Sequence, residues 1–103
     1  MSRKVTSSID LSVVREIVFD SPLDQTFSIE LVSSDLSADT TFHPEITISG
    51  DNWGTARESG IEISETLSQS VVFVDTFKVD KYNNYKFVFE GSTTGTVNYT
   101  IGY

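Results

Sequence analysis

The chain has 103 residues, of which fifteen are Asp or Glu, seven are Lys or Arg and none is Cys, and its net charge is −8. The missing cysteines exclude disulfides, thiolate metal sites and cysteine nucleophiles. A surface this acidic repels phosphate backbones and anionic lipids, so we expect neither nucleic-acid nor membrane partners.

The N-terminal residues are expected to lie outside the folded part of the chain. Arg3 and Lys4 are not followed by an apolar run, so the sequence predicts no signal peptide. No apolar run approaches the ~20 residues that cross a bilayer. We expect residues 1–8 to form a short flexible arm and residues 9–103 to fold as one domain, the usual outcome for a chain of this length.

The first half of the chain predicts two strands followed by a long loop. Apolar residues alternate with polar ones, as in a strand with one buried face, over residues 11–19 and 27–31. Turn-forming residues at 21–24 separate these two strands. Residues 33–44 are rich in Ser, Thr and Asp, which predicts a loop.

The second half predicts further short strands. Ile46 and Ile48 mark one strand, and Ile61 and Ile63 mark another. Residues 71–74 read Val-Val-Phe-Val and are apolar at every position. Such a run predicts a central strand that is covered on both faces.

The C-terminal segment carries the clearest pattern. Tyr85, Phe87 and Phe89 occupy alternate positions, residues 91–95 are a turn bounded by glycines, and alternate residues from 97 to 103 are apolar or aromatic. This pattern predicts a β-hairpin whose last strand is paired into the sheet. With about seven short strands and no amphipathic segment of helical length, we expect an all-β fold, a single antiparallel β-sandwich or jelly-roll-like domain.

The sequence offers no assembled catalytic or metal-binding set. His43 is the only histidine and has no evident partner nearby, so we interpret it as an ordinary loop residue. Residues 51–52 and 80–84 have the oxygen chemistry of a calcium site, but they lack EF-hand spacing and are typical of turns. We expect no enzyme activity, metal or cofactor; a small hydrolase built on a carboxylate pair is the least favoured hypothesis.

Trp53 is the only tryptophan and lies in a loop between two glycines. A ring in that position stacks on a sugar, anchors a protein interface, or folds back over one end of the sandwich. Tyr82 and Tyr103 leave the same alternatives open. We therefore name Trp53, Tyr82 and Tyr103 as candidate binding residues. A carbohydrate-binding module with a loop aromatic platform, and a glycan as its partner, is the alternative function.

The C-terminal segment combines Tyr85-Lys86-Phe87, the 91–95 turn and a strand that starts Gly95-Thr96-Val97. In these features it resembles the C-terminal hairpin of small all-β structural proteins of tailed bacteriophages. The resemblance implies a non-enzymatic virion structural or assembly protein, such as a capsid decoration or head-completion protein. It also implies a homo-oligomer that contacts other virion proteins and is located in the virion after assembly in the host cytoplasm.

Overall fold

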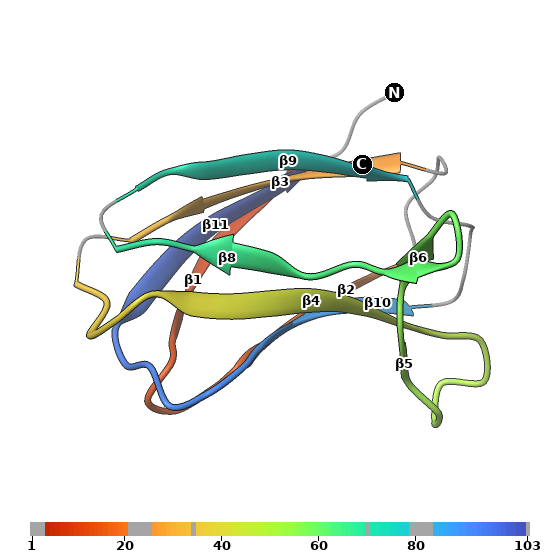
Figure 1. Cartoon of the computed structure of the whole chain (residues 1–103), viewed down its shortest axis with the longest axis horizontal. Coiled ribbons are helices and arrows are strands. Elements are labelled where there is room, and N and C mark those ends of the chain that lie inside the picture. Colours follow the sequence, from red (N-terminus) through yellow and green to blue (C-terminus); the bar gives the residue numbers. More distant parts are fainter. Residues whose placement is uncertain (1–3, 21–25, 34, 70, 79–83, 103) are drawn as a thin grey trace.

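The computed structural model describes residues 4–20, 26–33, 35–69, 71–78 and 84–102. In this part of the chain two antiparallel sheets pack as a sandwich, which confirms the predicted all-β fold (Figure 1). The strands are β1 (Lys4–Asp10), β2 (Glu16–Asp20), β3 (Thr26–Val32), β4 (Thr40–Thr47), β5 (Gly54–Thr55), β6 (Arg57–Glu58), β7 (Ile61–Glu62), β8 (Glu65–Leu67), β9 (Phe73–Lys78), β10 (Asn84–Phe89) and β11 (Thr96–Gly102). Among these described strands, seven have five residues or more, and the other four have two or three.

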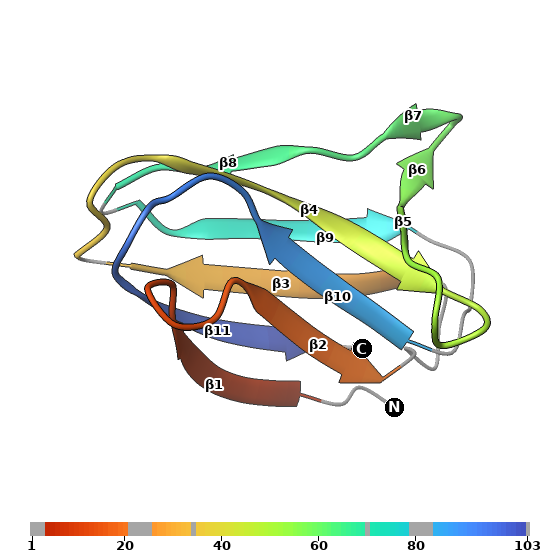
Figure 2. The same cartoon turned by 90° about the horizontal axis from the view of Figure 1, so that it is seen from below.

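The pairing order identifies the sandwich as a jelly roll. One sheet, called sheet A, has the order β1-β11-β3-β9; the other, sheet B, has the order β2-β10-β4, with β5 and β8 both beside β4. The pairs are nested along the chain: β4 with β8, β3 with β9, β2 with β10 and β1 with β11. This is the double-sheet arrangement of jelly rolls. Figure 2 shows β8 and β9 at one edge of the sandwich and β1 and β2 at the opposite edge.

Alternate side chains of both sheets fill the core. Tyr85, Phe87 and Phe89 on β10 are buried, as their alternation predicted. Phe42 on β4 joins the two sheets, because its ring centroid is 5.0 Å from that of Phe73 on β9. The rings of Phe87 and Phe89 lie at 6.0 and 5.4 Å from Phe42. The buried apolar residues are Leu11, Ile17, Ile29, Leu31, Leu36, Phe42, Ala56, Ile63, Leu67, Tyr85, Phe87, Phe89, Val97 and Ile101.

The predicted C-terminal hairpin is wrong. β10 pairs with β2 and β4 in sheet B, whereas β11 pairs with β1 and β3 in sheet A. Residues 91–95 therefore carry the chain from one sheet to the other. Gly95 has a φ of 129°, and a Cβ at this position would lie 2.7 Å from the carbonyl oxygen of Asp35. Glycine is needed here because the crossing passes directly against the β3–β4 connection.

The arm expected at residues 1–8 is a strand from Lys4 onward. β1 pairs with β11 along its whole length, from Lys4 opposite Gly102 to Asp10 opposite Thr96. Most residues of β1 are exposed, because the strand lies at the edge of sheet A. An edge strand of this kind lacks the apolar alternation that marks a strand in the sequence.

The strand predicted over residues 11–19 is also shorter than expected. Asp10 Oδ1 accepts hydrogen bonds from the Ser12 hydroxyl at 2.6 Å and from the Ser12 amide at 2.9 Å. These bonds close a turn after β1 and hold the pKa of Asp10 below its ordinary value. β2 begins only at Glu16, and Val13 is left exposed in the turn.

The loop predicted over residues 33–44 contains the first half of β4. Pro44 can occupy this inner strand because of where its missing N–H falls. Its carbonyl oxygen accepts a hydrogen bond from Ala56 N at 2.9 Å, so its nitrogen faces the same side of the strand. On that side β8 pairs with residues 40–42 and β5 with residues 45–46. Pro44 lies between the two pairings, and no ladder hydrogen bond is lost.

The central strand predicted at residues 71–74 is wrong as well. Within the described part of the chain β9 pairs only with β3, at the edge of sheet A. Val71, Val72 and Val74 are 54, 56 and 65% exposed. Two other apolar residues that the sequence predicts in strands, Ile48 and Ile61, are also exposed. An uninterrupted apolar run has the same sequence pattern in a central strand with both faces covered and in an edge strand with exposed side chains.

Deletion of residues 97–103 is expected to leave the protein insoluble or unfolded. β11 lies between β1 and β3, and Val97 and Ile101 are fully buried. Losing two such side chains costs about 3–6 kcal/mol, a large share of the ~5–15 kcal/mol by which a domain is stable. Solubility and circular dichroism of the truncated chain check this. A soluble product with an unchanged melting temperature would contradict it.

Candidate functional site

Trp53 lies in the connection between β4 and β5 and is half-buried. The ammonium of Lys86 on β10 is 4.3 Å from the centroid of the Trp53 ring, which is a cation–π contact. One face of this ring is therefore covered by a residue of the same chain. Tyr82 and Tyr103 lie outside the described residues. The binding role of these three aromatic residues stays a prediction.

Lys86 is the centre of a charge cluster on the outer face of sheet B. Its Nζ is 3.4 Å from Glu16 Oε1 on β2 and 3.8 Å from Glu45 Oε1 on β4, and its side chain is only 13% exposed. The ion pairs link three neighbouring strands, and the ring of Trp53 covers the ammonium from the loop side. The ammonium of Lys86 therefore has its partners within this chain.

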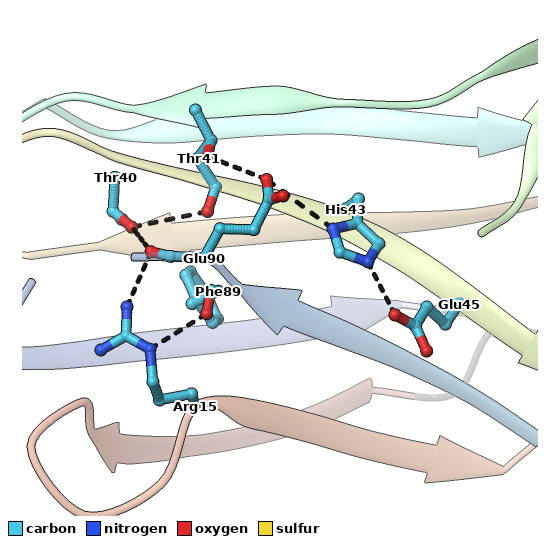
Figure 3. Close-up of polar contacts among 7 residues, drawn as sticks. All are labelled: Arg15, Thr40, Thr41, His43, Glu45, Phe89 and Glu90. Carbon is cyan, nitrogen blue, oxygen red and sulfur yellow. Dashed lines mark hydrogen bonds and ion pairs between the residues drawn. The ribbon is translucent and has the colours of Figure 1, made fainter. Parts of the chain in front are cut away.

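His43 lies in β4 and not in a loop, and it contacts two carboxylates on the same outer face (Figure 3). Its Nε2 is 2.7 Å from Glu45 Oε2, and its Nδ1 is 3.8 Å from Glu90 Oε2. Thr41 Oγ1 donates a hydrogen bond of 2.8 Å to the same Glu90 oxygen. Within the described part of the chain no three His, Cys, Asp or Glu residues form a metal-binding group. The cluster thus ties β4 to the end of β10.

Arg15 binds backbone carbonyls at the end of the sandwich where the chain crosses between the sheets (Figure 3). Its guanidinium donates hydrogen bonds to four backbone carbonyls, those of Leu11, Phe89, Glu90 and Thr93, at 2.7–3.1 Å. Leu11 belongs to the β1–β2 connection, and the other three lie at or beyond the end of β10. One side chain therefore holds the first and last crossings together.

A shallow hollow at the end of β4 is lined by Ile46, Thr47, Ile48, Ser49 and Asn52. Its hydroxyl oxygens are occupied by the local turn: Thr47 Oγ1 accepts from Gly50 N at 3.0 Å, and Ser49 Oγ accepts from two amides at 3.2 Å. Among the described residues, no acidic or basic side chain lines the hollow. Within the described residues no helix is long and apolar enough to cross a membrane.

The edge formed by β8 and β9, which we call the β8–β9 edge, combines exposed valines with inward carboxylates. Val74 points outward from sheet A and is 65% exposed. Glu65 on β8 is paired with the buried Phe42, and Asp75 on β9 with the buried Ile29. Because directly opposite residues share a face of the sheet, both carboxylates point into the gap between the sheets.

The two carboxylates are half-buried at the mouth of the sandwich. Burial, and then the charge of Asp75, raises the pKa of Glu65 above its ordinary value. Among the described residues neither acid has a cationic partner, and Asp75 Oδ1 accepts only the amide of Thr76, at 2.7 Å. Sequence analysis missed this pair, because Glu65 and Asp75 lie ten positions apart on different sheets.

Arg15→Lys is expected to destabilise the protein by about 2–4 kcal/mol, because a lysine ammonium cannot reproduce the forked geometry that serves four carbonyls. Urea unfolding measures the change. Arg57→Lys is the matched control. Arg57 makes an exposed ion pair of 3.3 Å with Glu62, so its replacement should change stability by less than about 1 kcal/mol. Equal effects of the two replacements would contradict the role given to Arg15.

Glu65→Gln is expected to stabilise the protein at neutral pH. Because the folded state raises the pKa of Glu65 above 4.5, the stabilising contribution of the protonated acid is present below pH 4.5 and is lost as the pH rises through the folded pKa. The stability advantage of the variant should therefore grow with pH. Urea unfolding from about pH 4 to about pH 7 checks this. Glu62→Gln, which removes an exposed carboxylate, should show no such gain.

Comparison with known proteins gives a fold and no family. No family model and no curated protein matches the sequence. The fold is similar to a solved structure described as "Bacillus endospore appendages form a novel family of disulfide-linked pili". The TM-score is 0.52 at 10% identity, covering 100% of this chain and 86% of that one. It is also similar to the crystal structure of PirA, with a TM-score of 0.52 at 10% identity, covering 99% and 91%.

The bacteriophage resemblance is wrong. It depends on a C-terminal hairpin, and the structure places β10 and β11 in different sheets. The two solved structures named above are an endospore appendage protein and PirA, and neither is a phage protein. The virion role, the virion partners and the virion location that followed from the resemblance are therefore withdrawn.

Proposed function

We propose that this chain is a non-enzymatic structural subunit that associates with copies of itself through the open edges of its sandwich. The observation that carries the proposal is β9, an edge strand on which Val74 is exposed, with the exposed Val72 directly before it. An edge strand presents unpaired backbone groups, and natural edges are usually blunted by charged side chains or Pro. Val74 and Thr76 carry no charge, and the charged residues of β9 are the inward Asp75 and its last residue, Lys78.

The direction of the strands supports repeated association. Sheet A has four strands, each antiparallel to its neighbour, so β1 and β9 run in opposite directions. When β9 of one copy lies beside β1 of the next, the antiparallel sheet continues, and both outer edges stay available. A contact of this head-to-tail kind builds rings or open filaments.

The similarity in fold supports a structural role. One protein of similar fold is described as forming disulfide-linked pili. The present chain has no cysteine, so its copies would be held by non-covalent contacts, for which open sheet edges are suited. The polar residues on the outer face of sheet B support the same role, since Lys86, His43 and their carboxylates are paired with one another.

Val74→Lys is expected to weaken self-association about 10-fold or more, because a lysine on an edge strand must be desolvated when another strand pairs there. Sedimentation velocity from micromolar to millimolar concentration measures this. Val13→Lys is the control, because it makes the same change in a turn at a side chain that is 77% exposed. A wild-type chain that stays monomeric throughout, or a Val74→Lys chain that matches wild type, would contradict the proposal.

A further inference from the structure

Two inward carboxylates lie at the edge through which the proposed self-association takes place. Glu65 is opposite the buried Phe42, and Asp75 is opposite the buried Ile29, so both acids occupy positions on the core side of their sheets. Both side chains are half-buried. Such positions of a sandwich are usually apolar, because burying a carboxylate costs free energy unless the group is paired or protonated.

The neighbouring strands do not compensate the charge of Glu65. The residues that face it from β4 are Thr40 and Phe42, and neither is charged. From β9 the facing group is Asp75, an acid. Burial, and then the charge of Asp75, raises the pKa of Glu65 above its ordinary value. A proton on Glu65 is therefore more favourable at this edge than in solvent.

Two further charged residues lie close to the pair along the chain. Glu62 lines the same shallow hollow as Glu65, and its carboxylate is 3.3 Å from the guanidinium of Arg57. Lys78 is the last residue of β9, three positions after Asp75. Neither reverses the shift at Glu65, in which the charge of Asp75 is the largest cause after burial.

A strand added beside β9 would cover the mouth in which the two acids lie. Asp75, now on the outermost strand of sheet A, would then lie between β3 and the added strand. Displacing water from a carboxylate disfavours its charged form, and the repulsion between two acids grows as the solvent between them is removed. Both effects favour proton uptake, whichever strand of a second copy is added and in whatever register.

We propose that the Glu65–Asp75 pair couples self-association to proton uptake, so that copies join through the β8–β9 edge more strongly as the pH falls. The inference rests on the proposed function, because it needs a second copy on β9. Covering the edge raises the pKa of Glu65 further. The stabilising contribution of the proton is therefore present below the pKa of the free chain and is lost as the pH rises through the pKa of the associated chain.

The pair thus acts as a reversible switch at an open sheet edge. Inward-pointing charges are one of the devices by which natural edge strands avoid unwanted pairing. A lysine in this role would stay charged over the whole range in which proteins fold, whereas a carboxylate with a raised pKa loses its charge in mildly acid solution. Charged acids oppose the contact at neutral pH, and a proton bound between them permits it.

Sedimentation velocity of the full chain from about pH 5.5 to about pH 7.5, at constant ionic strength, tests the coupling. The association constant of wild type should fall as the pH rises, by up to about tenfold per pH unit if one proton is taken up. Glu65→Gln combined with Asp75→Asn should associate more tightly than wild type at the highest pH and lose most of the pH dependence. Circular dichroism confirms that the variant folds.

Acidification also lowers the net negative charge of the whole chain, which favours any contact between copies. The matched control is therefore Glu30→Gln combined with Asp51→Asn, which removes the same two charges at exposed positions outside the mouth. It should keep the wild-type pH dependence. His43→Gln removes the only histidine, which lies on the outer face of sheet B, and should keep it as well.

Three results would overturn the inference and leave self-association standing. They are a wild-type association that does not change with pH, a pH dependence that survives the replacement of Glu65 and Asp75, and an equal loss of pH dependence in the matched control. If wild type does not associate at any pH in this range, the proposed function itself has failed, and the inference with it.

Discussion

The rest of the structure depends on the four hydrogen bonds from Arg15, which hold together one end of the sandwich. Three connections meet there: β1–β2, β3–β4 and β10–β11. Leu11 N donates to Gly95 O at 2.9 Å, and Ser37 N donates to Thr94 O at 3.0 Å. A connection that packs against others leaves carbonyls without partners, and only a guanidinium offers enough donors in a rigid fork to serve several of them. The crossings are thereby held in the register that lets β1 and β11 pair.

The sequence predicted strands better than it predicted their partners. The alternation of Tyr85, Phe87 and Phe89 identified a half-buried strand correctly, because burial of one face imposes a period of two. The glycine-rich turn that follows was misassigned, since a turn signal says that the chain reverses but not whether it stays in the same sheet. Gly95 is conformationally special because of Asp35, a residue sixty positions away in the sequence.

The candidate site was the least predictable part, for two physical reasons. Apolar residues such as Val72 and Val74 look alike in the sequence whether a neighbouring strand covers them or not. Glu65 and Asp75 become a pair only through the pairing of β8 with β4 and of β9 with β3, and neither pairing is local in the sequence. Trp53, in contrast, was identified from its glycine-flanked loop, but its contact with Lys86 depends on β10, more than thirty residues later.

The nested pairing has a consequence for how this protein is made. β1 finds its partner only in β11, from Lys4 opposite Gly102 onward, and β11 is also the inner neighbour of β3. During translation β1 and β3 therefore leave the ribosome before β11, the strand that lies between them, and sheet A cannot form completely until β11 has cleared the exit tunnel. Folds dominated by such distant contacts form slowly and expose strand edges while they wait. For this chain the nascent state, in which β1 has no partner and one side of β3 is open, is the stage at which chaperones would have the most to protect.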